Sequence, residues 1–389
     1  MTDKTAVPVP QQAAKGLQNV VVGQSKLSLV NGTEGKLIYA GYRIEDLAEH
    51  ADFEEVIYLL WHTKLPNRTE LEDLRKQLQA EMHLPQPVMD AIYTFPKDAT
   101  PMAVLRTVVS MLSLYDPKAD DNSVEENRRK ALQLTAKVPV IVAAYERARH
   151  GQAPVASRPE YRFAENFLWM LKGTEPQPQE SAVIDAYLVL LSEHGMNAST
   201  FSARVTTSTL SDMYSAMTTA IGTLKGSAHG GANEEAMRMF FEIGSAANVE
   251  NWFNTYIKTK QKRVMGMGHR VYKALDPRAA VLRKKSEEMS RATGNMQWFE
   301  LAVKLDEVAR QDPEFIEKKL YPNVDYYSAI ALYTLGIPMD QFTPLFGIAR
   351  MPGWTAHVLE QWADNRLIRP DVDYIGPMDL PWLPIDQRQ

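Results

Sequence analysis

The chain has 389 residues, 45% of them apolar and 23% charged, which is typical of a globular protein large enough for two domains. Its formal net charge of −5 argues against a general nucleic-acid-binding protein, so any anion site must be built from locally placed arginines. The lack of cysteine excludes disulfides, thiolate metal ligands and cysteine nucleophiles.

The first segment, residues 1–15, contains prolines and has no apolar central region. We therefore expect neither a secretory signal nor a membrane anchor there. The most continuous apolar stretch, 182–191, is interrupted by Asp185 and is about half the length that a bilayer span needs. The sequence predicts a buried helix at this stretch, no membrane association, and a cytoplasmic location.

Short apolar runs surround the dipeptide Asn31-Gly32 within residues 25–39. Asn-Gly favours two-residue hairpin turns, because both residues tolerate positive φ angles. We expect a small β-hairpin there. Strand signals are nearly lacking after residue 40.

From residue 52 onward the apolar residues have helical spacing. Asp52 is a candidate N-cap, and Pro66 marks the end of the helix that it starts. Thr69 and Glu72 have the spacing of a capping box, and Ser123 repeats the start signal. Helix follows helix, and the predicted fold class is all-α with one minor hairpin.

Two polar stretches that contain proline, 150–159 and 174–180, are predicted to be surface loops. Between 206 and 222, small residues recur four positions apart, which lets another helix approach closely. This spacing is consistent with tight internal packing and also with a subunit interface.

The chain has eight histidines, and no two have the i, i+4 spacing of a helical metal pair, so we expect no metal site. Most of them lie in ordinary helical or loop sequence. His194, His229 and His269 differ, because each lies beside a glycine at a predicted helix end. A histidine placed in this way can face a cleft, with its pKa tuned by the helix dipole.

In segment 224–235, His229 lies just ahead of a predicted helix start and is followed by Gly230 and Gly231. The glycines allow a ligand to approach the backbone closely. The positive end of the helix dipole favours a neutral imidazole, which can donate a hydrogen bond to a developing oxyanion.

Segment 263–278 combines glycines, His269 and several cationic side chains, which predicts an anion-binding loop. The segment does not fit either of two nucleotide-binding motifs. A Rossmann fingerprint would need a glycine where Val271 stands, and the Gly-Lys-Thr ending of a Walker loop is missing.

Asp325 lies in a mostly apolar run, 321–328, and burial there would raise its pKa and make it a usable base. The alternative role is a helix N-cap. Arg350 and Arg369 supply guanidinium groups suited to bidentate carboxylate binding, or to ordinary surface ion pairs.

Together these stretches resemble the citrate synthase family in order, spacing and flanking residues, from about 16 to 377. The resemblance implies a catalytic triad of His229, His269 and Asp325. Asp325 would remove a methyl proton from acetyl-CoA, and His229 would donate to the thioester oxygen. His269 would polarise and protonate the carbonyl of oxaloacetate, and the citryl thioester would then be hydrolysed.

The same resemblance implies that His194, Arg278 and Arg350 bind oxaloacetate, with Arg369 reaching in from the partner of a homodimer. It implies no permanently bound cofactor, since acetyl-CoA is a co-substrate. The residues that it suggests for coenzyme A are Arg263, Arg270, Lys273, Lys318 and Lys319.

The family fold implies a large helical domain from 1–221 and 326–389, with a small helical domain, 222–325, inserted. The small domain would carry the two catalytic histidines and close over bound oxaloacetate, which would exclude water from the site. Closure would also impose an order of binding, in which oxaloacetate binds before acetyl-CoA.

Three alternatives compete with this interpretation. 2-Methylcitrate synthase uses propionyl-CoA and the same triad, and one methylene in an apolar pocket is worth only about 1–3 kcal/mol. A non-catalytic sensor of coenzyme A or dicarboxylates would keep the fold without the reaction. A purely structural helical protein would leave the clustering of arginine and glycine unexplained.

Overall fold

The computed structural model describes residues 14–17 and 20–388, so the prediction about segment 1–15 lies almost wholly outside the described residues. The described chain is predominantly helical, with one small sheet, and this confirms the predicted all-α class. None of the helices in these ranges combines the length and hydropathy needed to cross a bilayer. The cytoplasmic location stays a prediction.

The sheet has three antiparallel strands in the order β1-β2-β3, and it confirms the predicted hairpin. Its strands are β1 (Ser28–Asn31), β2 (Lys36–Tyr39) and β3 (Tyr42–Arg43).

The predicted two-residue turn is wrong. Asn31 pairs with Lys36, so four residues form the loop, and it is Gly35 that has a positive φ, of 66°. Gly32 is required for a different reason. A Cβ atom there would lie 2.1 Å from the carbonyl oxygen of Val271, so the hairpin loop packs directly against segment 263–278.

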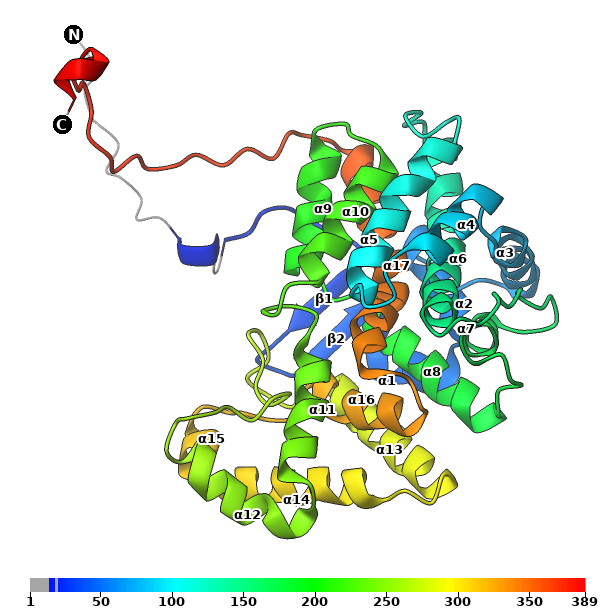
Figure 1. The fold of residues 1–389 in the computed structure, drawn as a ribbon, viewed down its shortest axis with the longest axis vertical. Helices are drawn as coiled ribbons and strands as arrows, with labels where there is room; N and C mark the ends of the chain where they lie inside the picture. The colour runs from blue at the N-terminus through cyan, green and yellow to red at the C-terminus, as the bar shows by residue number, and fades with distance from the viewer. Residues whose placement is uncertain (1–13, 18–19, 389) are drawn as a thin grey trace.

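The helices fall into two groups in Figure 1. Those of the upper and central part are α1 (Ile44–His50), α2 (Phe53–His62), α3 (Arg68–Glu81), α4 (Gln86–Thr94), α5 (Pro101–Leu112), α6 (Val124–Arg149), α7 (Phe163–Lys172), α8 (Pro178–Leu191), α9 (Ala198–Ser208), α10 (Met213–Leu224) and α17 (Phe342–Ala363). Those of the lower part are α11 (Ala232–Ile243), α12 (Val249–Trp252), α13 (Pro277–Ala292), α14 (Gln297–Gln311), α15 (Pro313–Glu317) and α16 (Val324–Thr334). Short 3-10 turns occur at Lys15–Leu17, Ser113–Tyr115, Ala246–Asn248, Met339–Gln341 and Ile385–Gln387, and a π turn at Phe253–Ile257.

The helix starts agree with the sequence signals except at α3. Asp52 caps α2 through a capping box with Glu55, and Ser123 accepts a hydrogen bond at the start of α6, as predicted. Helix α3 begins one residue after Asn67, whose side chain accepts from the amide of Glu70. The predicted capping box two residues further along the chain is therefore wrong, because Asn67 already satisfies the first amides.

The end of α2 also differs from the prediction. Helix α2 stops at His62, and Thr63 takes a left-handed conformation with φ of 55°. Pro66 therefore follows the helix end without setting it. The apolar stretch 182–191 forms the buried part of α8, which starts at Pro178 and shortens the second predicted loop.

The small-residue segment 206–222 spans two helices, α9 and α10, that pack against each other. The hydroxyl oxygens of Thr206 and Thr219 lie 3.1 Å apart across this contact. The structure confirms the internal packing, and a subunit interface on the outer faces stays a prediction.

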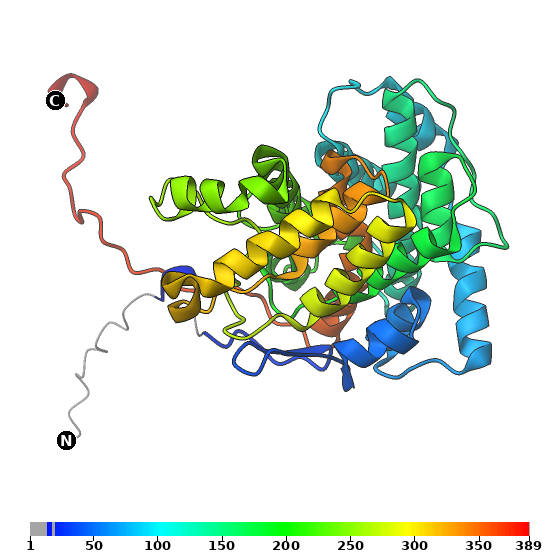
Figure 2. The ribbon, with the colours of Figure 1, turned by 90° about the horizontal axis from the view of Figure 1, so that it is seen from below.

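Helix α17 is the centre of the first group, because it is buried along most of its length and packs on α6, α8, α9 and α10. Helix α13 in turn packs on α16 and α8. The end of α8, the middle of α17 and the starts of α13 and α16 thus lie in one region. Beyond α17, Asn365 and Ile368 still contact Ser208 at the end of α9, and the chain from there to residue 388 runs away from the body (Figures 1 and 2).

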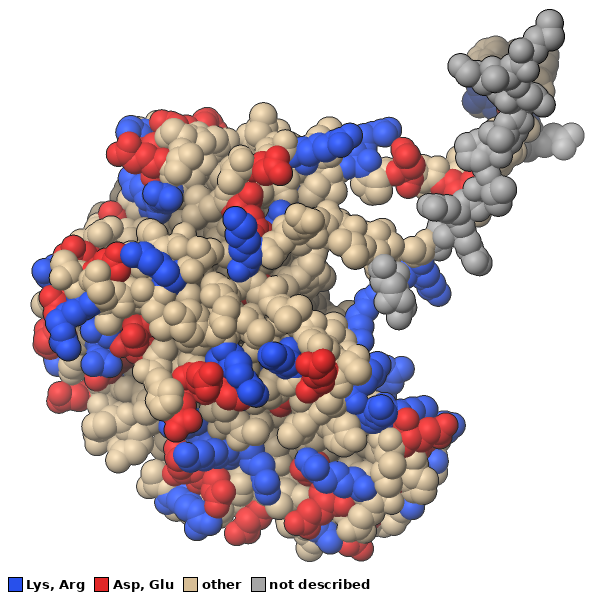
Figure 3. Space-filling view, turned by 180° about the vertical axis from the view of Figure 1, so that it is seen from behind, with Lys and Arg blue, Asp and Glu red and all other residues tan. Residues whose placement is uncertain are grey.

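Basic and acidic side chains are interspersed over the face shown in Figure 3. This distribution fits the small net charge of −5. On this face the basic side chains do not form one continuous surface. An anion site would therefore depend on a few neighbouring cations.

Candidate active site

The structure brings together six of the predicted site residues: Arg278, in the first turn of α13, and five from other positions in the chain. His194 follows α8, His229 lies between α10 and α11, His269 precedes α13, Asp325 is in the first turn of α16, and Arg350 is in α17. The rings of His194 and His269 are 5.3 Å apart between centroids. Arg350 lies close enough to affect the pKa values of both His229 and Asp325.

His229 is held as a neutral imidazole. Its Nε2 atom lies 2.8 Å from Ser199 Oγ and 3.3 Å from the backbone nitrogen of Ser199. A backbone N–H can only donate, so Nε2 is the acceptor and Nδ1 carries the proton. Burial, and then the positive charge of Arg350, lower the pKa of His229 to about 4. The residue is therefore a neutral donor at neutral pH, as the sequence predicted.

His269 is fixed in the opposite tautomer. Its Nδ1 atom accepts hydrogen bonds from the backbone nitrogens of Val271 at 3.1 Å and Tyr272 at 3.2 Å. The proton therefore lies on Nε2. Burial, followed by the charge of Arg278, lowers the pKa of His269 to about 4. Its Nε2–H is a second neutral donor.

His194 completes the group of imidazoles. Its Nε2 atom lies 3.1 Å from the hydroxyl oxygen of Tyr272. Burial, and then Arg278, His269 and Arg350, hold the pKa of His194 well below its usual range. Tyr272 therefore contacts His194 through its hydroxyl and His269 through its amide, a role that the sequence analysis missed.

Two buried guanidinium groups lie beside these histidines. Arg278 forms a bidentate pair with Asp276, with Nη2–Oδ2 at 2.8 Å and Nε–Oδ1 at 3.0 Å. Arg350 donates from Nε to the carbonyl of Leu191 at 2.5 Å and lies over the ring of Phe346. Each guanidinium has five N–H donors, so both retain donors for further carboxylates. Asp276 was missed, although its position before a proline at a helix start was a visible cap signal.

Asp325 is not the cap of α16, because Asn323 fills that position and accepts from the amide of Asp325 at 2.9 Å. Burial raises the pKa of Asp325 to about 6, and Asp276 adds to the rise, while Arg278 and Arg350 oppose it. The group is thus largely ionised at neutral pH and still basic enough to accept a proton. This favours the predicted base over the N-cap alternative.

The cations predicted for coenzyme A are all exposed: Arg263, Arg270, Lys273, Lys318 and Lys319. Lys319 has a positive φ of 54° and lines a small hollow together with His269. The backbone nitrogen of Lys273 donates to the carbonyl of Gly32 at 2.8 Å, which ties this loop to the hairpin. Lys318 is paired with Glu314.

Arg369 does not reach the site of its own chain. It lies in segment 364–388, its side chain is 79% exposed, and its guanidinium is 3.8 Å from Asp371. The contribution of Arg369 to the site of a partner subunit stays a prediction.

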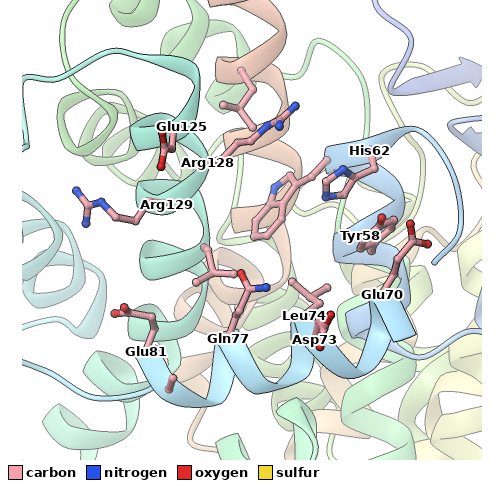
Figure 4. A pocket seen from close by; sticks show the side chains of 14 residues that line it. Tyr58, His62, Glu70, Asp73, Leu74, Gln77, Glu81, Glu125, Arg128 and Arg129 are labelled. Atoms are coloured by element: carbon pink, nitrogen blue, oxygen red, sulfur yellow. The ribbon is translucent and has the colours of Figure 1, made fainter. Parts of the chain in front are cut away.

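A cavity of about 610 Å³ lies elsewhere, between α2, α3, α6 and α17 (Figure 4). Trp61, Leu74 and Leu132 line its apolar part, and charged groups such as Glu70 and Arg128 line its edge. No predicted site residue lines it. Within the described ranges, no three His, Asp or Glu side chains are grouped as metal ligands would be.

The chain matches the family model described as "Citrate synthase, C-terminal domain" over residues 16–371. It is 47% identical to "Citrate synthase 2" of Bacillus subtilis, over 97% of this chain and 99% of that protein. A "Citrate/2-methylcitrate synthase" of the same organism is 37% identical, over 94% of this chain and 97% of that protein. Among solved structures, the citrate synthase of Thermoplasma acidophilum with carboxymethyl coenzyme A and oxaloacetate superimposes with a TM-score of 0.92, at 34% identity, covering 97% of this chain and 100% of that one.

Proposed function

Because this chain belongs to the citrate synthase family, we propose that His229, His269 and Asp325 carry out the family's reaction. That reaction condenses acetyl-CoA with oxaloacetate and water, and it yields citrate and coenzyme A. The observation that supports the assignment most strongly is that two neutral histidine donors and one basic carboxylate lie beside two buried arginines.

Asp325 starts the reaction by taking a proton from the methyl group of acetyl-CoA. A carboxylate is a weak base toward a methyl group, so the enolate must be stabilised as it forms. The Nδ1–H of His229 is the donor for the thioester oxygen. A neutral imidazole gives this hydrogen bond without placing a second positive charge beside Arg350.

The enolate carbon then attacks the keto carbon of oxaloacetate and forms the new carbon–carbon bond. The Nε2–H of His269 polarises the keto oxygen and transfers its proton to the alkoxide. Water subsequently attacks the thioester carbonyl of citryl-CoA, and cleavage of the C–S bond releases citrate and coenzyme A. His229 and His269 each donate from the ring nitrogen that their hydrogen bonds leave protonated.

Oxaloacetate carries two carboxylates, and Arg278, Arg350 and His194 are the groups proposed to bind it. The guanidinium of Arg278 is already oriented by Asp276, so little conformational entropy is lost when the substrate binds. Coenzyme A is proposed to lie against the exposed cations, Arg263, Arg270, Lys273, Lys318 and Lys319.

We also propose a homodimer in which Arg369 binds the substrate of the partner subunit. Segment 364–388 supports this, because it carries large apolar side chains that are exposed in a single chain. Exposed apolar groups on this scale are typical of a surface that another chain covers. The exposed side chains are Leu367, Val372, Tyr374, Ile375, Met378, Leu380, Trp382, Leu383 and Ile385. Sedimentation of the full chain tests the assembly, and a monomer would contradict it.

The proposed domains are 1–221 with 326–389, and 222–325, and the second is proposed to close over oxaloacetate. Closure would exclude water from the enolate and bring His229 and His269 to the substrate. Small-angle scattering should show compaction when oxaloacetate and a coenzyme A analogue are added together. Unchanged dimensions would contradict the closure.

The reaction is tested by following release of the coenzyme A thiol from acetyl-CoA and from propionyl-CoA, with and without oxaloacetate. We expect release to require oxaloacetate and kcat/KM to be higher for acetyl-CoA. Preference for propionyl-CoA would make the chain a 2-methylcitrate synthase with the same catalytic groups. No release from either thioester would favour the non-catalytic sensor.

A further inference from the structure

Two segments that carry proposed catalytic groups meet in one short backbone pairing. Met267 and Pro322 form an isolated antiparallel bridge. On either side of it, the Gly268 amide donates to the Tyr321 carbonyl and the Asn323 amide donates to the Gly266 carbonyl, both at 2.8 Å. The first segment leads directly into His269, and the second leads into α16 and Asp325.

The side chain of Asn323 spans this junction and is only 8% exposed. Its Oδ1 atom accepts from the backbone nitrogen of Asp325 at 2.9 Å, and its Nδ2 atom donates to the carbonyl oxygen of Gly268 at 2.8 Å. The amide orientation is determined by its partners, because the reversed amide would direct N–H against N–H and C=O against C=O.

We propose that Asn323 is a positioning residue that sets the separation between the base, Asp325, and the acid, His269. This inference rests on the proposed function. One amide contacts the backbone of Asp325 itself and the residue before His269, so moving either partner changes the geometry of the other. The enolate carbon and the keto carbon must be aligned for bond formation between Asp325 and His269. A small misplacement of either side chain therefore slows the reaction strongly.

The surroundings leave little space for the junction to shift. Gly266 has φ of 75°, and a Cβ atom there would lie 2.8 Å from Cα of Tyr326. Gly268 has φ of 83°, and its Cβ atom would lie 2.8 Å from a methyl carbon of Leu320. The backbone that precedes His269 therefore packs closely on the start of α16 and its preceding loop. Asn323 supplies the polar contact at that packed surface.

Asparagine satisfies a requirement that other N-cap residues do not. Serine and aspartate also accept a hydrogen bond from the first helical amides. Serine is too short to reach Gly268 as well, and aspartate has no N–H to donate to a carbonyl. Aspartate would also place a second negative charge beside Asp325, which would raise the pKa of the base. The two substitutions therefore predict different kinetic effects.

The test compares Asn323→Ser with Asn67→Ser, the same change at the N-cap of α3, which contributes no residue to the site. We expect Asn323→Ser to lower kcat between about fivefold and a hundredfold, the range given by loss of one hydrogen bond and by a misplacement of about 1 Å. The KM for oxaloacetate should stay within about twofold, because Arg278 and Arg350 are untouched. Asn67→Ser should change thermal stability similarly and leave kcat unchanged.

A wild-type kcat in folded Asn323→Ser would overturn the inference. If that variant does not fold, Asn323→Asp, which keeps the cap, gives the answer: its kcat should fall and the acid limb of its pH–rate profile should move to higher pH. An unmoved limb with normal kcat would equally overturn it. Asp325→Asn separates this failure from failure of the proposed function, because wild-type turnover in that variant would refute the function itself.

Discussion

Asp325 on α16 and Asp185 on α8 are both carboxyl groups whose pKa is raised chiefly by burial, to about 6 and to about 8 respectively. Their neighbours differ. Asp325 faces Arg278 and Arg350 and lies in the region of His229 and His269.

Asp185 lies beside Glu54, whose pKa burial also raises. Asp185 accepts from the backbone nitrogen of Phe53 at 3.1 Å, and Glu54 accepts from that of Phe163 at 3.1 Å. These bonds hold the first turns of α2 and α7 in place. A raised pKa therefore does not identify a catalytic base, and the convergence of donors, cations and glycine-rich loops around the carboxylate is what does.

Replacing Asp325 by asparagine should have the largest effect on catalysis. The substitution keeps the shape but removes the base, so we expect kcat to fall by about 10²–10⁴-fold, the range for general-base catalysis. Binding of oxaloacetate, measured by calorimetry, should be largely retained because the arginines remain. A variant with nearly full thiol release would show that the base lies elsewhere.

The change His229→Ala tests the stabilisation of the enolate. Loss of one aligned donor costs about 10²–10³ in kcat. His150→Ala is the matched control, since this side chain is 55% exposed at the end of α6 and contacts Glu146. We expect the control to retain its rate of thiol release. Equal losses in the two variants would point to a structural effect.

Asp185→Asn should affect stability, with kcat unchanged. A carboxyl group with a raised pKa binds more protons in the folded than in the unfolded state, so it lowers the free energy of unfolding as pH rises from about 4 to about 8. Asparagine removes this penalty and can still accept from Phe53. The free energy of unfolding of Asp185→Asn should therefore exceed that of the wild type by an amount that grows with pH. The increase should be at most about 1.4 kcal/mol per pH unit. Urea denaturation of both proteins near pH 4 and near pH 8 measures this difference in free energy. A difference that shrinks as pH rises would contradict a raised pKa at Asp185.

The sequence signals that mark the proposed catalytic groups are local. Glycines beside His229 and His269, and an apolar run around Asp325, are visible without a structure. The neutral state predicted for His229 agrees with the lowered pKa of that residue, although burial and Arg350 lower it and not the helix start.

Contacts between distant segments could not be predicted in the same way. The need for Gly32 comes from the carbonyl of Val271, which is remote in sequence. The roles of Ser199 and Asn323 depend on hydrogen bonds to His229 and Gly268, which only the folded chain brings near. Local cap signals also compete, and for that reason the start of α3 was misplaced.

The most direct test of the central claim, that Asp325 is the base, is the pH dependence of kcat/KM for coenzyme A release. The account predicts that the rate falls tenfold per unit below a pKa of about 6, because the carboxylate must be ionised to accept the proton. The same limb should appear in folded Asp185→Asn. A rate that is constant through this range, or a limb that Asp185→Asn abolishes, would contradict the account.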